Sequence, residues 1–120
     1  MDPSLDLHAC TYTQHVFDVL GKRWTGLIID LLLQRPARYN ELVRAIPQLT
    51  KRVLTQRLAE LQAAGLVARD VDEGPPLAVT YRLTSRGEAL RPAMDALRVW
   101  AGAPVDAEGV PLAYQDHRDQ

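Results

Sequence analysis

The sequence predicts a mainly α-helical fold with one small β-hairpin, and three observations lead to this prediction. Apolar residues recur at helical spacing through much of residues 11–64. Residues 67–72 and 78–83 are rich in β-forming residues and flank the turn-forming sequence Glu73-Gly74-Pro75-Pro76. Another helical pattern follows the second of these segments. The expected order is therefore four helices, a hairpin and a last helix.

The first two helices are predicted before Pro36. One begins at Thr11 or Thr13 and ends at Gly21. The other runs from about Arg23 to Leu33, and its apolar residues cover a wide arc, so it is the expected central helix of the core. The apolar positions of these two helices are Val16, Val19, Leu20, Trp24, Leu27, Ile28, Leu31 and Leu32.

The next two helices are separated by a short turn. Tyr39–Ile46 forms the first of them, and Pro47 ends it because the residue before a proline resists the α conformation. The second helix covers residues 50–64, is capped by Thr50 and stops at Gly65. Its inward face consists of Leu54, Leu58 and Leu61. This arrangement is a helix-turn-helix, and the hairpin that follows it is placed as a wing.

A last long helix is expected to begin after the hairpin. Thr84 or Ser85 can cap it, and Glu88 stands where a capping box with Ser85 needs it. Its apolar stripe consists of Leu90, Met94, Leu97 and Trp100, with Ala93 and Ala101. The predicted fold is thus a winged helix-turn-helix.

A chain of 120 residues is sized for one domain. We expect an N-terminal arm at 1–10, the winged helix-turn-helix domain at 11–101 and a C-terminal tail at 102–120 that can join a dimer interface. The sequence has no apolar run long enough for a membrane helix, and its acidic start does not resemble a signal peptide. Cys10 is the only cysteine, which fits a reducing compartment. We therefore expect a cytoplasmic protein.

The net charge of −1 conceals a basic centre between acidic ends. Residues 22–69 carry nine Lys or Arg against three acids, whereas residues 1–21 and 70–120 both carry an excess of acids. This distribution is typical of a surface that contacts phosphates, although scattered solvated charges would give a similar count.

The outward face of helix 50–64 carries side chains suited to reading base pairs. Arg52, Thr55 and Gln56 are the predicted base contacts. Arginine can donate two hydrogen bonds to guanine, and glutamine can pair with adenine. The alternative is an amphipathic surface helix with a solvated face, which the turn before it and the hairpin after it disfavour.

Phosphate contacts are predicted at the edges of this face and on the preceding helix. Lys51 and Arg57 lie at the boundary of the outward face, where a phosphate is easier to reach than a base. Arg38 and Asn40 can clamp the DNA backbone, or they can serve as a local cap of helix 39–46. The wing tip has no Lys or Arg, so deep insertion into a minor groove is not expected unless Arg69 or Arg82 contributes from the strands.

A series of short motifs extends over about residues 8–101: Cys10, Leu20-Gly21-Lys22-Arg23-Trp24, Arg38-Tyr39-Asn40-Glu41-Leu42, Leu54-Thr55-Gln56-Arg57-Leu58, Gly65-Leu66-Val67, Pro75-Pro76 and Val79-Thr80-Tyr81-Arg82-Leu83-Thr84. In this order they closely resemble the HxlR family of bacterial transcriptional regulators, which are winged-helix proteins related to the MarR regulators. The resemblance implies a homodimer, built from the terminal helices, that binds a pseudo-palindromic double-stranded DNA operator in the major groove.

The chain departs from the family pattern at two places. Gln48-Leu49-Thr50 stands where the family usually has Gly, then Ile or Leu, then Ser. Thr80 stands where the family commonly has Glu. Threonine caps a helix as serine does, so the first change keeps the helix but removes the glycine from the turn. The second change affects a polar contact of the strand and not the strand itself.

The resemblance also implies thiol-based sensing of oxidants or electrophiles through Cys10. Lys22, Arg23 or a helix N-terminus can lower a thiol pKa and favour the thiolate. Without a second cysteine, only an intersubunit disulfide or an adduct can form. The alternative is a small residue without a switching role. A metal site at His8, Cys10 and His15 lacks a fourth ligand and is not expected.

Two other functional classes remain to be compared with a DNA-binding regulator. A winged-helix module for protein–protein contact would keep the core pattern but would need no basic face. An enzyme would need a nucleophile with an adjacent base, a phosphate loop or paired carboxylates, and we find none of these patterns in the sequence. We therefore expect no catalytic residue and no cofactor.

Overall fold

The computed structural model of the protein describes residues 6–112. In chain order the elements are α1 (Thr11–Leu20), α2 (Thr25–Gln34), β1 (Ala37–Arg38), α3 (Tyr39–Ala45), α4 (Lys51–Ala63), β2 (Val67–Asp72), β3 (Ala78–Leu83), α5 (Ser85–Glu88) and α6 (Arg91–Trp100). The predicted order of four helices, hairpin and helical end is confirmed. Residues 1–5 of the predicted arm and 113–120 of the predicted tail lie outside the described residues.

Helix α2 is the centre of the core, as its wide apolar arc predicts. Ile28 and Ile29 are fully buried, and Leu32 is nearly so. The buried arc is rotated from the expected one, because Leu27 is 52% exposed. Trp24 precedes the helix with a left-handed φ of 79°, so α2 begins at Thr25, two residues later than the predicted start at about Arg23.

The predicted helix-turn-helix is formed by α3 and α4. Leu54, Leu58 and Leu61 are the buried residues of α4, as the spacing predicts. The Thr50 hydroxyl accepts a hydrogen bond from the backbone N–H of Val53 at 3.2 Å, which makes it the N-cap. Gly65 ends the helix with a φ of +76°, a conformation that strains residues with a Cβ atom.

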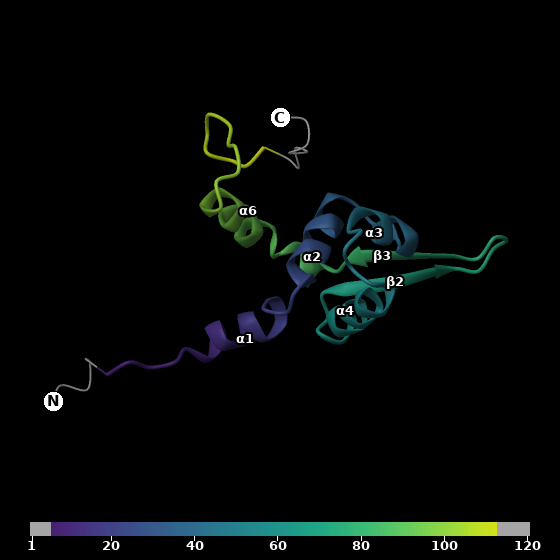
Figure 1. The fold of residues 1–120 in the computed structure, drawn as a ribbon, viewed down its shortest axis with the longest axis horizontal. Helices are drawn as coiled ribbons and strands as arrows, with labels where there is room; N and C mark the ends of the chain where they lie inside the picture. Colours follow the sequence, from purple (N-terminus) through teal and green to yellow (C-terminus); the bar gives the residue numbers. More distant parts are fainter. Residues whose placement is uncertain (1–5, 113–120) are drawn as a thin grey trace.

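The hairpin belongs to a three-stranded antiparallel sheet in the order β1-β3-β2. Strands β2 and β3 have the predicted bounds, and Val67 pairs with Leu83. Strand β1, with only two residues, was not predicted because it is too short to show a period. The hairpin projects from the body of the molecule as a long wing (Figure 1).

The expected long last helix is wrong, because the structure has two helices, α5 and α6, in its place. Pro92 lacks an N–H group, and its ring would clash with the carbonyl of Glu88 in a continuous helix. Thr84 is the cap of α5, since its hydroxyl accepts from the N–H of Gly87 at 3.2 Å. Glu88 does not form the predicted capping box with Ser85 and pairs with Arg91 at 3.1 Å instead.

Helices α1 and α6 lie at the end of the molecule opposite the wing tip (Figure 1). Neither helix has a buried residue. The most exposed of their large apolar side chains belong to Tyr12, Phe17 and Trp100, at 83%, 65% and 86% exposure. Within residues 6–112, none of the helices combines the length and hydropathy that crossing a bilayer requires.

Candidate nucleic-acid interface

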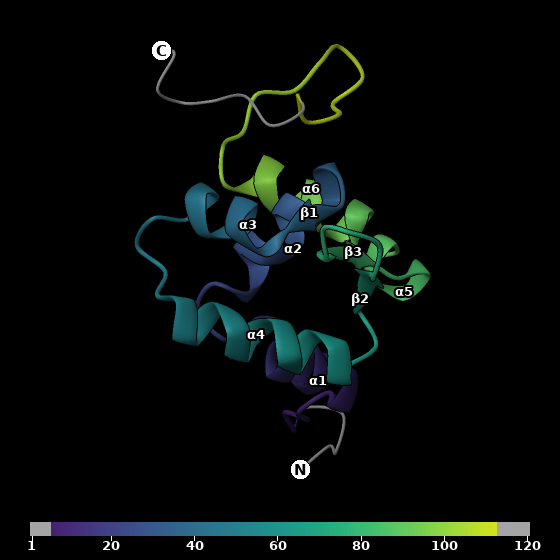
Figure 2. The same cartoon turned by 90° about the vertical axis from the view of Figure 1, so that its right-hand side faces the viewer.

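Helix α4 crosses the molecule below the sheet, with one long side turned to solvent (Figure 2). Its three buried leucines fix which side faces the core, and the opposite side carries Lys51, Arg52 and Gln56, all exposed. The first turn of the helix has free backbone N–H groups next to these cations. The arrangement gives the solvent side of α4 a positive N-terminal half, which suits a phosphate backbone.

The predicted base contact Thr55 is exposed, but its hydroxyl already has a partner. The Tyr39 hydroxyl lies 2.9 Å from Thr55 Oγ1 and donates to the Lys51 carbonyl at 3.0 Å. Tyr39 therefore ties the start of α3 to the first turns of α4 and fixes the angle between them. We did not predict this role, because only the packing of α3 on α4 brings the phenol to that carbonyl.

Four basic side chains near this surface form no ion pair with a carboxylate of the described chain. They are Arg38, Lys51, Arg52 and Arg69. A cation without a protein partner keeps its full charge for an external anion. Three of these residues belong to the predicted contact set, and Arg69 was considered only as a contribution from the wing.

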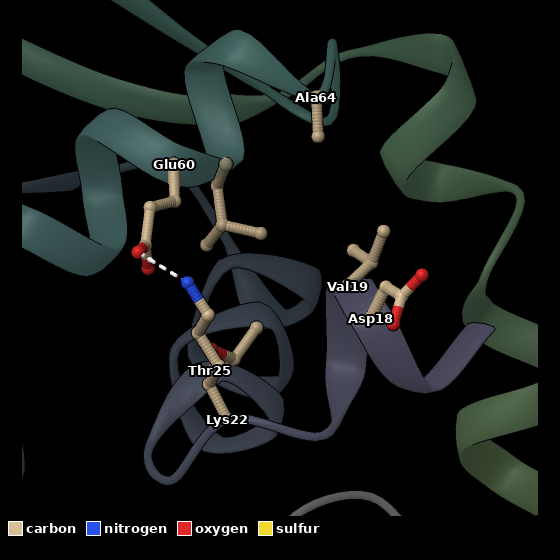
Figure 3. Close-up of a pocket in the computed structure, with 7 residues that line it drawn as sticks. Asp18, Val19, Lys22, Thr25, Glu60 and Ala64 are labelled. Atoms are coloured by element: carbon tan, nitrogen blue, oxygen red, sulfur yellow. Dashed lines mark hydrogen bonds and ion pairs between the residues drawn. The ribbon is translucent and has the colours of Figure 1, made fainter. Parts of the chain in front are cut away.

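Arg57 differs from these free cations, because internal contacts hold its guanidinium group. Its Nε donates to the Arg23 carbonyl at 3.1 Å, its Nη1 lies 3.1 Å from Glu60, and the side chain is only 16% exposed. Glu60 also pairs with Lys22 at 2.6 Å (Figure 3), and this hydrogen bond is the main reason that the Glu60 pKa is lowered. The geometry supports a structural role for Arg57 more than the predicted phosphate contact.

The start of α3 shows how Arg38 and Asn40 are placed. Glu41 accepts a hydrogen bond from the Arg38 backbone N–H at 2.9 Å and pairs with Arg35 at 2.6 Å. The hydrogen bond from Arg35 is the main cause that lowers the Glu41 pKa to about 2. Glu41 thus provides the local cap that was considered for Arg38 and Asn40, whose side chains are exposed.

The two arginines of the wing strands differ in their partners, because one forms an ion pair across the hairpin and the other does not. Arg82 pairs with Asp70 at 2.7 Å across the hairpin. Arg69 is opposite Tyr81 in the register, so it shares the face of the hairpin from which Tyr81 enters the core. Asp72 and Glu73 at the tip are exposed. An acidic tip opposes phosphate contact, so Arg69 is the basic group that the wing can add.

Cys10 is exposed and immediately precedes α1. Its pKa is lowered, chiefly by a side-chain hydrogen bond from Thr13 and then by the backbone N–H groups of Thr13 and Tyr12. These groups in the first turn of α1 favour the thiolate, and Lys22 and Arg23 are not among the causes.

The comparisons with known proteins agree with this architecture. The HxlR-like helix-turn-helix family matches residues 19–108. The regulator YvaP of Bacillus subtilis is 39% identical over 97 residues, which cover 81% of this chain and 90% of YvaP.

Two similar solved structures are also regulators. The reduced form of the transcriptional regulator YodB from B. subtilis aligns with a TM-score of 0.72 and 37% identity over 78% of this chain and 92% of YodB. The redox regulator HypR in its oxidised form aligns with a TM-score of 0.73 and 34% identity over 82% of this chain and all of HypR. These relatives are transcriptional regulators and not enzymes. The chain therefore belongs to the HxlR-like helix-turn-helix family of transcriptional regulators.

Proposed function

We propose that this regulator is a homodimer that binds a pseudo-palindromic DNA operator and places α4 of each subunit in the major groove. The observation that carries the proposal is the exposed face of α4, where Lys51 and Arg52 have no carboxylate partner in the described chain while the leucines of the same helix are buried. Cations at the N-terminus of a helix are repelled by the positive end of the helix dipole. Unpaired cations at this position are therefore unfavourable for the free helix and favour binding of an anion such as a phosphate.

Arg52 and Gln56 are the main base contacts in this proposal. Thr55 contributes its methyl group, because its hydroxyl is held by Tyr39. Lys51, Arg38 and Asn40 contact phosphates, and Arg69 is added to them from the wing. Arg57 is assigned to holding α4 against the turn between α1 and α2, because its guanidinium group donates to the Arg23 carbonyl and pairs with Glu60.

Selection of bound duplexes from a random pool tests this proposal. We expect recovered sequences with two inverted half-sites about one helical turn apart, roughly 10 base pairs. The affinity for them should fall steeply with salt, because phosphate contacts release counterions. The rival function, a winged-helix module for protein contact, predicts no enriched sequence and a flat salt dependence.

The dimer is proposed to form through α1 and α6. These helices bury no residue within the described chain although they carry Tyr12, Phe17 and Trp100. Exposed aromatic side chains of this size are typical of protein interfaces. A second copy of the chain would cover them and would set the spacing of the two α4 helices.

Cys10 is proposed as the sensor of an oxidant or electrophile. YodB has been solved in a quinone-bound form and after treatment with diamide, and it is 37% identical to this chain in both structures. The lowered thiol pKa and the exposure of Cys10 support the same chemistry here. In an adduct with N-ethylmaleimide, the thiolate sulfur forms a bond to an alkene carbon, and the neighbouring carbon takes up a proton.

The sensor proposal predicts that Thr13→Val raises the Cys10 pKa and slows alkylation at neutral pH, because the largest cause of the lowered pKa is removed. The pH dependence of the alkylation rate measures this effect, and Thr11→Val is the matched control. Modification of Cys10 by N-ethylmaleimide should also change the affinity for the selected operator. Unchanged affinity after complete modification would exclude the sensor role.

A further inference from the structure

A cavity of about 140 Å³ lies between α1, the start of α2 and the C-terminal half of α4 (Figure 3). Its apolar wall is formed by Val19, Leu61 and Ala64. The volume is about that of an engineered apolar cavity in another protein that binds benzene. The cavity can therefore hold a compound with a body of about one ring.

Thr25 lines this cavity and is only 2% exposed. Its backbone N–H donates to the Lys22 carbonyl at 3.2 Å, but its hydroxyl has no hydrogen-bond partner within residues 6–112. A buried hydroxyl without a partner is unfavourable, since it has lost its hydrogen bonds to water. A ligand with a polar group at this position would recover that loss.

The charges around the cavity favour a cationic group over an anionic one. Lys22 and Glu60 neutralise each other on one side, where they are 2.6 Å apart (Figure 3). Arg57 adds a second cation to Glu60 from outside the cavity. Asp18, on the side formed by α1, has no ion pair in the described part of the chain. The charged residues that line the cavity, Asp18, Lys22 and Glu60, therefore carry a net charge of −1, and Asp18 is the acid among them without an ion pair within residues 6–112.

We propose that this cavity binds a small amine with an apolar body, and that the amine regulates DNA binding. The apolar body packs against Val19, Leu61 and Ala64, while the ammonium group donates to the Thr25 hydroxyl and is attracted by Asp18. Only the regulatory half of this inference rests on the proposed function.

Regulation follows from which elements form the cavity. Val19 belongs to α1, which we propose as part of the dimer interface, and Leu61 belongs to α4, which we propose to enter the DNA groove. A compound that contacts both helices favours one position of α1 relative to α4. If DNA favours one such position as well, the two bound molecules must change each other's affinity by the same factor.

Titration of the free full-length protein with three ring compounds of similar size tests the site. Benzylamine carries the cation, benzyl alcohol is its neutral counterpart and benzoate is the anion. We expect saturable binding at millimolar concentrations for benzylamine, with amide NMR shifts at Val19 and Ala64. Benzyl alcohol should bind more weakly, and benzoate should not bind. Equal or tighter binding of benzoate, or no saturable binding of benzylamine, would overturn the proposal.

Two conservative variants assign the binding to this cavity. Thr25→Val keeps the side-chain shape and removes the hydroxyl, whereas Asp18→Asn removes the charge. Each should weaken benzylamine several-fold, and Thr25→Ser should restore most of the affinity. Glu73→Gln removes an acid from the distant wing tip and should change nothing. If Thr25→Val and Asp18→Asn bind as the wild type does, the compound does not occupy this cavity.

The regulatory half is tested by repeating the benzylamine titration on the protein saturated with the selected operator. The Kd for benzylamine should change several-fold, and operator affinity should change by the same factor when benzylamine is saturating. An unchanged Kd would contradict regulation of DNA binding by the amine but would not contradict the binding site itself. A protein that binds benzylamine but no DNA would contradict the proposed function alone.

Discussion

The helix-turn-helix core buries its apolar side chains, whereas the two terminal helices leave many of theirs exposed. Helix α4 buries all three leucines of its inward face to 1–2% exposure, whereas α6 buries none of its residues. The apolar stripe of α6 is nevertheless regular, and it leaves Leu97 and Trp100 54% and 86% exposed. Helix α4 thus finds its partner surface within the chain, whereas α1 and α6 leave apolar side chains uncovered, which supports the proposed dimer.

The attachment of α6 to the core supports the same comparison. Arg91 donates to the Leu33 carbonyl at 2.7 Å, and Arg98 bonds to both Asp30 and Asp95. Burial raises the Asp30 pKa, and the charge of Arg98 opposes that increase. Polar contacts thus join α6 to the end of α2, while most of its apolar stripe stays outside the core.

Substitutions in the core should destabilise the fold more than any others. Leu58→Ala removes a side chain that is 1% exposed and should lower the free energy of unfolding by about 2–5 kcal/mol. Leu77→Ala, at a wing residue that is 68% exposed, should change it by no more than about 0.5 kcal/mol. Urea denaturation of both variants measures the difference. Similar losses in the two would mean that the core is not where the structure places it.

The terminal helices should affect association more than folding. Phe17→Ala and Trp100→Ala each remove an exposed aromatic side chain and should weaken dimerisation by about 2 kcal/mol, roughly 30-fold. Sedimentation equilibrium over a range of concentrations measures the constant, with Leu77→Ala as the control. A wild-type protein that is monomeric at all concentrations, or unchanged association in both variants, would contradict the proposal that α1 and α6 form a dimer interface.

The core could be predicted from the sequence more fully than the surface. Leu54, Leu58 and Leu61 repeat at helical spacing, and the bounds of β2 and β3 follow from the turn at Glu73-Gly74-Pro75-Pro76. These are local signals. The break between α5 and α6 is local too, and Pro92 could have indicated it, but the apolar stripe that continues past the proline predicts one helix.

The surface contacts that could not be predicted join segments that are distant in the sequence. Arg57 lies at the edge of the polar face of α4, and only the fold brings the Arg23 carbonyl and Lys22 to the Arg57–Glu60 pair. In the sequence, Tyr39 is an ordinary first residue of a helix, because its hydrogen bond to the Lys51 carbonyl depends on how α3 packs against α4. Periodicity therefore predicts which side chains face outward, but it does not predict which outward side chains already have partners.

The smallest expected effect is a pH dependence from the start of α3. The Glu41 pKa falls from 4.5 to about 2 in the folded chain, so the unfolded chain binds this proton at higher pH. The resulting stabilisation is complete above about pH 4.5 and is lost as the pH falls toward 2. Stability curves against pH for Glu41→Gln and Arg35→Gln should lose the same part of the acid slope. If both variants keep the wild-type dependence of stability on pH below about pH 4.5, the Arg35–Glu41 ion pair does not contribute to stability in this range.

Arg52→Lys is the variant that separates sequence reading by the outward face of α4 from simple attraction to phosphates. Lysine keeps the charge but loses the paired donors that recognise guanine. Affinities should be measured for the selected operator and for a scrambled duplex at one salt concentration. We predict that affinity for the operator falls by about 1–3 kcal/mol, while affinity for the scrambled duplex stays within error. An equal change on both duplexes would show that Arg52 contributes only charge, and would contradict sequence reading by this face.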